Sequence, residues 1–252
     1  MVHGGSNSTT AYRDTRLGLR HLRVRLGALE TELEASHPGW IVRSDARLTC
    51  FAKLANTVES AELALKFLDE CLAKGSWWAA NYNPMPTSAD TSIYIQEFSQ
   101  FAKTGMLQLA FGAVESSFRV FLRAIDPEAC EGSTREFKSV YECLLRTKLG
   151  LPDVDDRIAL LDLLRILRNS IHNHGVFFHR TKADTTVTYR GQRYDFAHES
   201  RIEFAPWPFL VTLIGDAAEL LSVVAHSPEI SGYASPLLDP AVRVERRVLQ
   251  EP

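Results

Sequence analysis

The sequence predicts a mainly α-helical fold, an up-down bundle of helices with a small β-hairpin inserted before the last helix. Three observations support this fold class. Apolar residues recur at steps of three to five over most of the chain, which is the spacing of a helix with one buried face. Glycines, prolines and capping residues separate these segments. Near residues 184–197 the pattern changes to two short β-branched and aromatic runs around a glycine, which is typical of a hairpin.

The first half of the chain divides at clear helix-stop signals. Residues 1–12 are rich in Gly, Ser, Thr and Asn, and they predict a disordered tail. Three helices are then expected at about 14–36, 44–74 and 88–125, and a loop with two prolines separates the last two. Gly105 and Gly112 lie inside the third helix, where each costs about 1 kcal/mol relative to alanine. We therefore expect close helix packing at these glycines.

The second half is divided in the same way. Ser133 and Glu136 form an S-x-x-E capping box before a fourth helix. A fifth helix is expected from about 155 to 173, because Asn173 and Gly175 are C-terminal signals. The remaining expected segments are the hairpin at 184–197, a last helix at about 208–225 and a loose charged tail at 240–252. The pattern predicts one domain over residues 13–239.

Composition places the chain among ordinary globular proteins. It has 252 residues, of which 45% are apolar and 23% charged, and its net charge is −3. There is thus no global basic field of the kind that broad nucleic-acid binders carry, so any contact with RNA must be local. The four cysteines include no C-x-x-C pair, which favours reduced thiols over a disulfide framework.

Targeting and cofactor motifs are also missing from the sequence. The polar start lacks the apolar region of a signal peptide, and no window approaches the roughly 18–20 uncharged apolar residues of a membrane span. A cytoplasmic protein without membrane contact is expected. Walker, G-x-G-x-x-G and G-x-S-x-G motifs do not occur, so no cofactor is expected and nucleotide hydrolysis, dinucleotide chemistry and serine hydrolysis have no motif support.

The candidate functional residues concentrate in RNSIHNHGVFF, residues 168–178, where the fifth helix ends. At about 100° per residue, one helix face is apolar and faces the core. The opposite face gathers the polar residues Arg165, Arg168, Asn169 and His172. His174 is expected on a fraying last turn, so it points elsewhere.

Three interpretations of this cluster stay open. Arg and His favour a helix C-terminus, where cations offset the negative end of the dipole and donate to free carbonyls. A zinc site would use His172, His174 and His179, although the sequence nearby offers no carboxylate ligand. A metal-free ribonuclease site needs a general base for the 2′-hydroxyl and a cation for the phosphate. Histidine and arginine supply those two groups, and asparagine can orient either.

At this point the sequence resembles the HEPN domain superfamily, whose motif is Arg, a polar residue and then His after four to six intervening residues. Arg168-Asn169 matches the first part, and five residues separate Arg168 from His174. Arg165 and His172 are separated by six, without the polar follower. Helix geometry favours His172 and the spacing rule favours His174, so both are candidate bases, with Arg168 as phosphate stabiliser and Asn169 as orienting group.

The resemblance implies a helical HEPN-like core over about residues 45–225. Many members cleave RNA without a metal, leave 2′,3′-cyclic phosphate ends and belong to toxin–antitoxin or antiviral defence systems. The resemblance therefore implies RNA as substrate, a homodimer through the motif helix and an antitoxin or effector partner. Other members have lost activity, and the alternative expectation is a non-catalytic module for dimerisation or protein interaction.

Arg165 is a second-tier candidate for RNA binding, and arginines of the first helix are further candidates. Arg16, Arg20 and Arg23 form part of a basic stripe suited to phosphates, and the competing interpretation is a solvated face balanced by later glutamates. The pairs Trp77-Trp78 and Phe177-Phe178 could stack bases, although such aromatics more often belong to a core or an interface.

Overall fold

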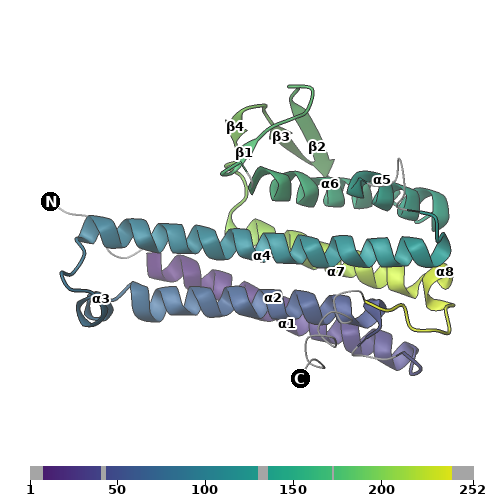
Figure 1. Cartoon of the computed structure of the whole chain (residues 1–252), viewed down its shortest axis with the longest axis horizontal. Helices are drawn as coiled ribbons and strands as arrows, with labels where there is room; N and C mark the ends of the chain where they lie inside the picture. Colours follow the sequence, from purple (N-terminus) through teal and green to yellow (C-terminus); the bar gives the residue numbers. More distant parts are fainter. Residues whose placement is uncertain (1–7, 41–43, 130–135, 172, 240–252) are drawn as a thin grey trace, which may run out of the picture.

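The computed structural model describes residues 8–40, 44–129, 136–171 and 173–239. Its long helices are α1 (Ser8–Ser36), α2 (Ala46–Phe67), α4 (Ser88–Ile125), α6 (Val154–Ile171) and α7 (Trp207–His226). Helices α1, α2, α4 and α7 run along the long axis of the molecule, and α6 lies beside α4 with the strands beyond it (Figure 1). The mainly helical fold with a small β region before the last long helix is therefore confirmed.

Shorter elements connect the long helices. They are the π-helical turn η1 (Leu68–Leu72), α3 (Gly75–Asn81), α5 (Phe137–Glu142), the π-helical segment η3 (Cys143–Lys148) and α8 (Pro228–Ser231). The expected hairpin is present as β2 (Thr185–Tyr189) paired antiparallel with β3 (Gln192–Phe196). Arg190 and Gly191 both have positive φ at its turn, as the tight two-residue hairpin requires. Strand β1 (Val176–Phe177) pairs antiparallel with β4 (Ser200–Arg201) and closes this region.

Helix α7 supplies part of the central core. By length and composition it could span a membrane, contrary to the expectation that no window of the sequence would qualify. However, 56% of its most apolar window is buried inside the protein, where it packs against α1, α4 and α6. This burial is what a core helix of a bundle requires, and it accounts for the apolar sequence of α7.

Two expected boundaries in the first half were wrong. Helix α1 begins at Ser8, so the helix takes in residues 8–12 of the expected tail, and residues 1–7 lie outside the described ranges. The expected loop after residue 74 contains helix α3. Trp78 accounts for α3, because its ring is buried and its Nε1 donates to the carbonyl of Leu72 at 2.7 Å. The burial and hydrogen bond of Trp78 stabilise α3 although the local sequence does not predict a helix there.

Two further expectations were also wrong. A Cβ built on Gly105 or Gly112 would meet no atom within 4 Å outside its own helix, so no described helix packs closely on these glycines. Helix α5 begins at Phe137 with Glu136 at its N-cap and no side-chain cap. Glu136 is therefore not at the third helical position that a capping box requires, and Ser133 lies outside the described residues.

The β region is held against the C-terminal end of α6. The chain leaves α6 through a left-handed turn, in which His174 and Gly175 have φ values of 54° and 82°. This matches the C-terminal signals expected there. At the far end of the hairpin, the Tyr189 hydroxyl and the Arg190 guanidinium both donate to Asp216 of α7, each at 2.8 Å. The strands therefore form a fixed wall beside α6.

Candidate functional site

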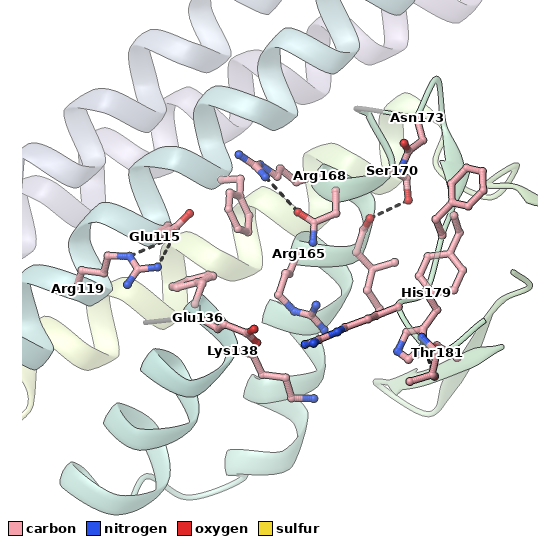
Figure 2. Close-up of a pocket in the computed structure, with 18 residues that line it drawn as sticks. Glu115, Arg119, Glu136, Lys138, Arg165, Arg168, Ser170, Asn173, His179 and Thr181 are labelled. Carbon is pink, nitrogen blue, oxygen red and sulfur yellow. Dashed lines mark hydrogen bonds and ion pairs between the residues drawn. The ribbon is translucent and has the colours of Figure 1, made fainter. Parts of the chain in front are cut away.

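A cavity of about 690 Å³ lies over the C-terminal half of α6. Arg165, Arg168 and Asn169 of α6 form its floor. Figure 2 shows Glu115 and Arg119 of α4 on one side of this floor, and His179 and Thr181 of the loop between β1 and β2 on the other. The volume falls within the range of about 300–1,000 Å³ that is typical of ligand sites.

The cavity is locally basic in a chain of net negative charge. Its lining includes five cationic side chains, Arg119, Lys138, Arg165, Arg168 and Arg180. Only two carboxylates, Glu115 and Glu136, line the same space, which leaves three positive charges with His179 counted as neutral. A concave basic surface concentrates anions, so an anionic ligand is the class that this cavity favours.

Arg165 belongs to a network that fixes it in place. Its Nη2 donates to Asp162 at 2.7 Å, and the Tyr141 hydroxyl donates to the same carboxylate at 2.6 Å. Burial acts to raise the pKa of Asp162, but the Tyr141 and Arg165 hydrogen bonds outweigh it and hold that pKa below its usual value. The same carboxylate, together with burial, raises the pKa of Tyr141. Asp162 of the same helix thus neutralises Arg165. The guanidinium of Arg165 is engaged in this network rather than available to a ligand.

Arg168 has no such partner. Its Nη1 donates to Asn169 Oδ1 at 3.2 Å, and its Cζ lies 5.4 Å from the centre of the Phe111 ring. Its Nε is buried without a hydrogen-bond partner, a situation that it shares with only Gln108 Oε1 among the side chains that the structure describes. A buried donor without an acceptor is costly. The guanidinium as a whole lines the cavity with one neutral side-chain partner, Asn169, so its charge is not neutralised there.

A salt bridge between Glu115 and Arg168 is conceivable from the sequence, but the structure does not contain it. Instead Glu115 accepts from Arg119 one turn along α4, at 2.6 Å, which is an ordinary intrahelical pair. Across the described parts of the chain, no carboxylate neutralises Arg168 or Arg180. These two are therefore the lining cations with most of their charge available to a ligand.

The motif residues are only partly brought together. Arg168 and Asn169 both line the cavity, and Asn169 is exposed to solvent. His174 is exposed on the left-handed turn after α6 and is not among the lining residues. His172 lies outside the described residues. In the part of the chain that the structure describes, no group of three or more His, Cys, Asp or Glu side chains forms a metal site.

His179 was considered in the sequence only as a zinc ligand and was not placed beside Arg168. It lines the cavity, and its Nδ1 lies 2.8 Å from Thr181 Oγ1. Its backbone N–H donates to His198 Nδ1 at 3.1 Å, while the backbone N–H of His198 donates to Asp184. These long-range contacts depend on the pairing of β1 with β4, and no short motif in the sequence indicates them.

The arginines of α1 form ion pairs with neighbouring helices. Arg16 and Arg20 both reach Glu62 of α2, at 3.1 and 2.7 Å, and Arg23 pairs with Glu59. Arg16 also contacts Asp69 at 3.1 Å, and Glu62 raises its pKa against the opposing effect of burial. These partners come from α2 and η1 rather than from the later glutamates of α1. The stripe is therefore largely neutralised and presents little charge to a phosphate.

The two aromatic pairs have different positions. Trp78 is buried in α3, and Trp77 packs edge-on against Phe67, so this pair belongs to the hydrophobic core and its rim. Phe177 is buried as well. Phe178 is 52% exposed and lines the cavity, so it is the one ring of these two pairs that is open to solvent at the site.

No protein-family model, curated protein or solved structure matches this chain. The resemblance to HEPN domains therefore rests on the Arg168-Asn169 motif and its place at the end of a helix.

Proposed function

We propose that the cavity over α6 binds the sugar–phosphate backbone of RNA and that the protein is a HEPN-like, metal-independent endoribonuclease. One observation carries this proposal: the Arg168 guanidinium lines the cavity, and no carboxylate among the described residues neutralises it. A phosphate would supply the missing negative charge, and the planar guanidinium suits its oxygens better than an ammonium does. The surplus of positive charge around Arg168 supports the same ligand class.

The chemistry follows from this placement. Arg168 stabilises the negative charge that grows on the phosphate as the 2′-hydroxyl attacks, and Asn169, bonded to Arg168, orients it. The base that takes the 2′-hydroxyl proton is His172 or His174, as the motif implies. The products carry 2′,3′-cyclic phosphate and 5′-hydroxyl ends.

The test is cleavage of total RNA in EDTA by wild type and by Arg168→Ala, Asn169→Ala, His172→Ala and His174→Ala. Arg123→Ala is the matched control, since Arg123 is an exposed arginine of α4 that does not line the cavity. Wild type and the control are expected to cut, and Arg168→Ala is expected to lose activity while staying folded. Intact RNA with folded wild type, or full activity in Arg168→Ala, contradicts the proposal.

An exposed apolar face favours a second candidate, a module for dimerisation or protein interaction. Phe101 and Leu109 are 73% and 60% exposed on α4, and the open positions Gly105 and Gly112 lie along the same helix. The homodimer through the motif helix and an antitoxin or effector partner belong to the same set of proposals. Sedimentation velocity with wild type and Phe101→Glu tests whether this α4 face joins two copies.

A cytoplasmic location completes the proposal. The three cysteines of the described ranges, Cys50, Cys71 and Cys143, are all free thiols, which suits a reducing compartment.

A further inference from the structure

The loop between β1 and β2 forms the cavity wall that the motif does not include. It contributes His179, Arg180 and Thr181 to the lining. The loop is fixed at both ends, because the His179 backbone N–H donates to His198 and the His198 backbone N–H donates to Asp184, at 3.1 and 2.8 Å. A side chain on this loop is therefore held in a defined position beside the cavity rather than on a free surface segment.

The contacts of His179 leave one ring nitrogen available to a ligand. Nδ1 is engaged by Thr181, whose Oγ1 lies 2.8 Å away and whose backbone N lies 3.3 Å away. Nε2 has no hydrogen-bond partner within the described part of the chain. In the protonated ring Nε2 carries a hydrogen, and this is the proton that the ring can give up.

We propose that His179 is the general acid of the cleavage reaction, an inference that rests on the proposed ribonuclease function. The 2′-oxygen bonds to phosphorus and its proton passes to the base, His172 or His174. The bond from phosphorus to the 5′-oxygen breaks, and that oxygen takes the Nε2 proton of protonated His179, whose ring is left neutral. The products are a 2′,3′-cyclic phosphate and a 5′-hydroxyl, and both histidines regain their starting protonation from water.

The arrangement of the charges agrees with this assignment. Arg168 is on the floor of the cavity and Arg180 follows His179 on the wall, so a phosphate in the cavity lies among cations from two elements. An acid on this loop can protonate the leaving oxygen of a phosphate that Arg168 binds on the α6 floor.

A purely structural role for His179, as a partner of Thr181 in the loop, predicts something different. Loss of a structural histidine slows every substrate equally. Loss of a general acid slows only substrates whose leaving group needs a proton. General acid catalysis contributes typically 10²–10⁴-fold, so the two roles differ by an amount that is easily measured.

The experiment uses an RNA oligonucleotide with one mapped cleavage site and a matched oligonucleotide with sulfur in place of the bridging 5′-oxygen. A thiolate leaves without a proton. His179→Ala is therefore expected to lose roughly 10²–10⁴-fold in rate on the oxygen substrate and less than about tenfold on the sulfur substrate. His179→Gln repeats the test with a side chain of similar size that cannot transfer the proton, and exposed His21 of α1, changed to Ala, is the control.

Each outcome decides between the hypotheses. Equal losses on the two substrates, or a full rate on the oxygen substrate, overturn the role of His179 while wild-type cleavage still supports the ribonuclease. No cleavage of either substrate by folded wild type overturns the ribonuclease and the role of His179 together. A rate restored by sulfur in both His179→Ala and His179→Gln supports the general acid.

Discussion

Replacing Arg168 and Arg165 separately by methionine distinguishes a ligand-binding arginine from a structural one. The two residues are on the same helix and lose the same charge. Their surroundings differ, because Arg165 pairs with Asp162 whereas Arg168 has a buried Nε without an acceptor. Methionine keeps much of the length of the arginine side chain without its donors. We therefore expect Arg165→Met to lower the stability of the protein with little effect on RNA affinity. Arg168→Met should weaken RNA binding with little effect on stability.

The magnitudes follow from the contacts. In Arg168→Met, removal of the unpaired buried donor is worth about 1–3 kcal/mol in favour of folding. Loss of the hydrogen bond to Asn169 costs about 1 kcal/mol, and loss of the contact with the Phe111 ring costs about 0.5–1 kcal/mol. These effects nearly cancel, so the free energy of unfolding is expected to change by between about −1 and +1.5 kcal/mol.

In Arg165→Met, the Asp162 carboxylate loses its cation at 2.7 Å and keeps only the Lys138 cation at 3.4 Å, while its side chain is 15% exposed. Breaking a fully buried pair costs about 3–5 kcal/mol, and we expect about 2–3 kcal/mol here because Arg165 is 27% exposed. Urea unfolding followed by circular dichroism measures both changes, provided that the slope of unfolding free energy against urea is unchanged.

For RNA affinity the order of the two variants should be reversed, with the larger loss in Arg168→Met. Binding of a 2′-O-methyl RNA, which cannot be cleaved, is measured by fluorescence anisotropy. Loss of one charged hydrogen bond of about 1.5–3 kcal/mol weakens binding roughly 10- to 150-fold in Arg168→Met. Folded Arg165→Met should retain most of its affinity. The reasoning is refuted if Arg168→Met destabilises the protein as much as Arg165→Met does, or binds this RNA as tightly as wild type.

Three further predictions concern acid stability, salt and the outer face of α4. The pKa of Asp162 is lowered in the folded protein, so its contribution to stability is present above about pH 4 and is lost as the pH falls further. Unfolding free energies from pH 6 to pH 2 should therefore decline less steeply in Asp162→Asn. Arg180→Ala should reduce the slope of log affinity for RNA against log salt by about 0.7, and Arg123→Ala should leave it unchanged. Gly105→Ala and Gly112→Ala should each raise the unfolding free energy by about 1 kcal/mol, because the added methyl group meets nothing. A loss of stability in either glycine variant would show that this face is covered.

Local signals predict those elements whose stabilising contacts lie close together in the sequence. The hairpin was predicted within a residue or two, since its pattern and its Arg190-Gly191 turn are adjacent. Helix α6 was predicted because its apolar stripe and its end signals at Asn173 and Gly175 are contiguous. Helix α3 was missed because the interior that Trp78 enters comes from other elements.

The features of the candidate site likewise fall into those that local sequence signals predict and those that depend on tertiary contacts. The helix period places Arg168 and Asn169 together, and the structure puts both in the cavity. The neutralisation of Arg16 and Arg20 by Glu62 depends on how α1 packs against α2, and a pattern within one helix cannot indicate it. His179 reaches the cavity only after β1 has paired with β4, so its position depends on a fold-level contact.

The end of α6 also bears on the simplest interpretation of the cluster, that its cations cap the helix. That interpretation expects them to donate to free carbonyls of the last turn. The structure already satisfies two of these with backbone amides: the Ser170 carbonyl accepts from Asn173 and Gly175, at 3.0 and 2.9 Å, and the Ile171 carbonyl accepts from His174 at 3.1 Å. Arg168 donates to the Asn169 side chain instead. A cap is therefore not what holds this guanidinium at the cavity, where no carboxylate of the described residues neutralises it, and a bound anion accounts for its position better.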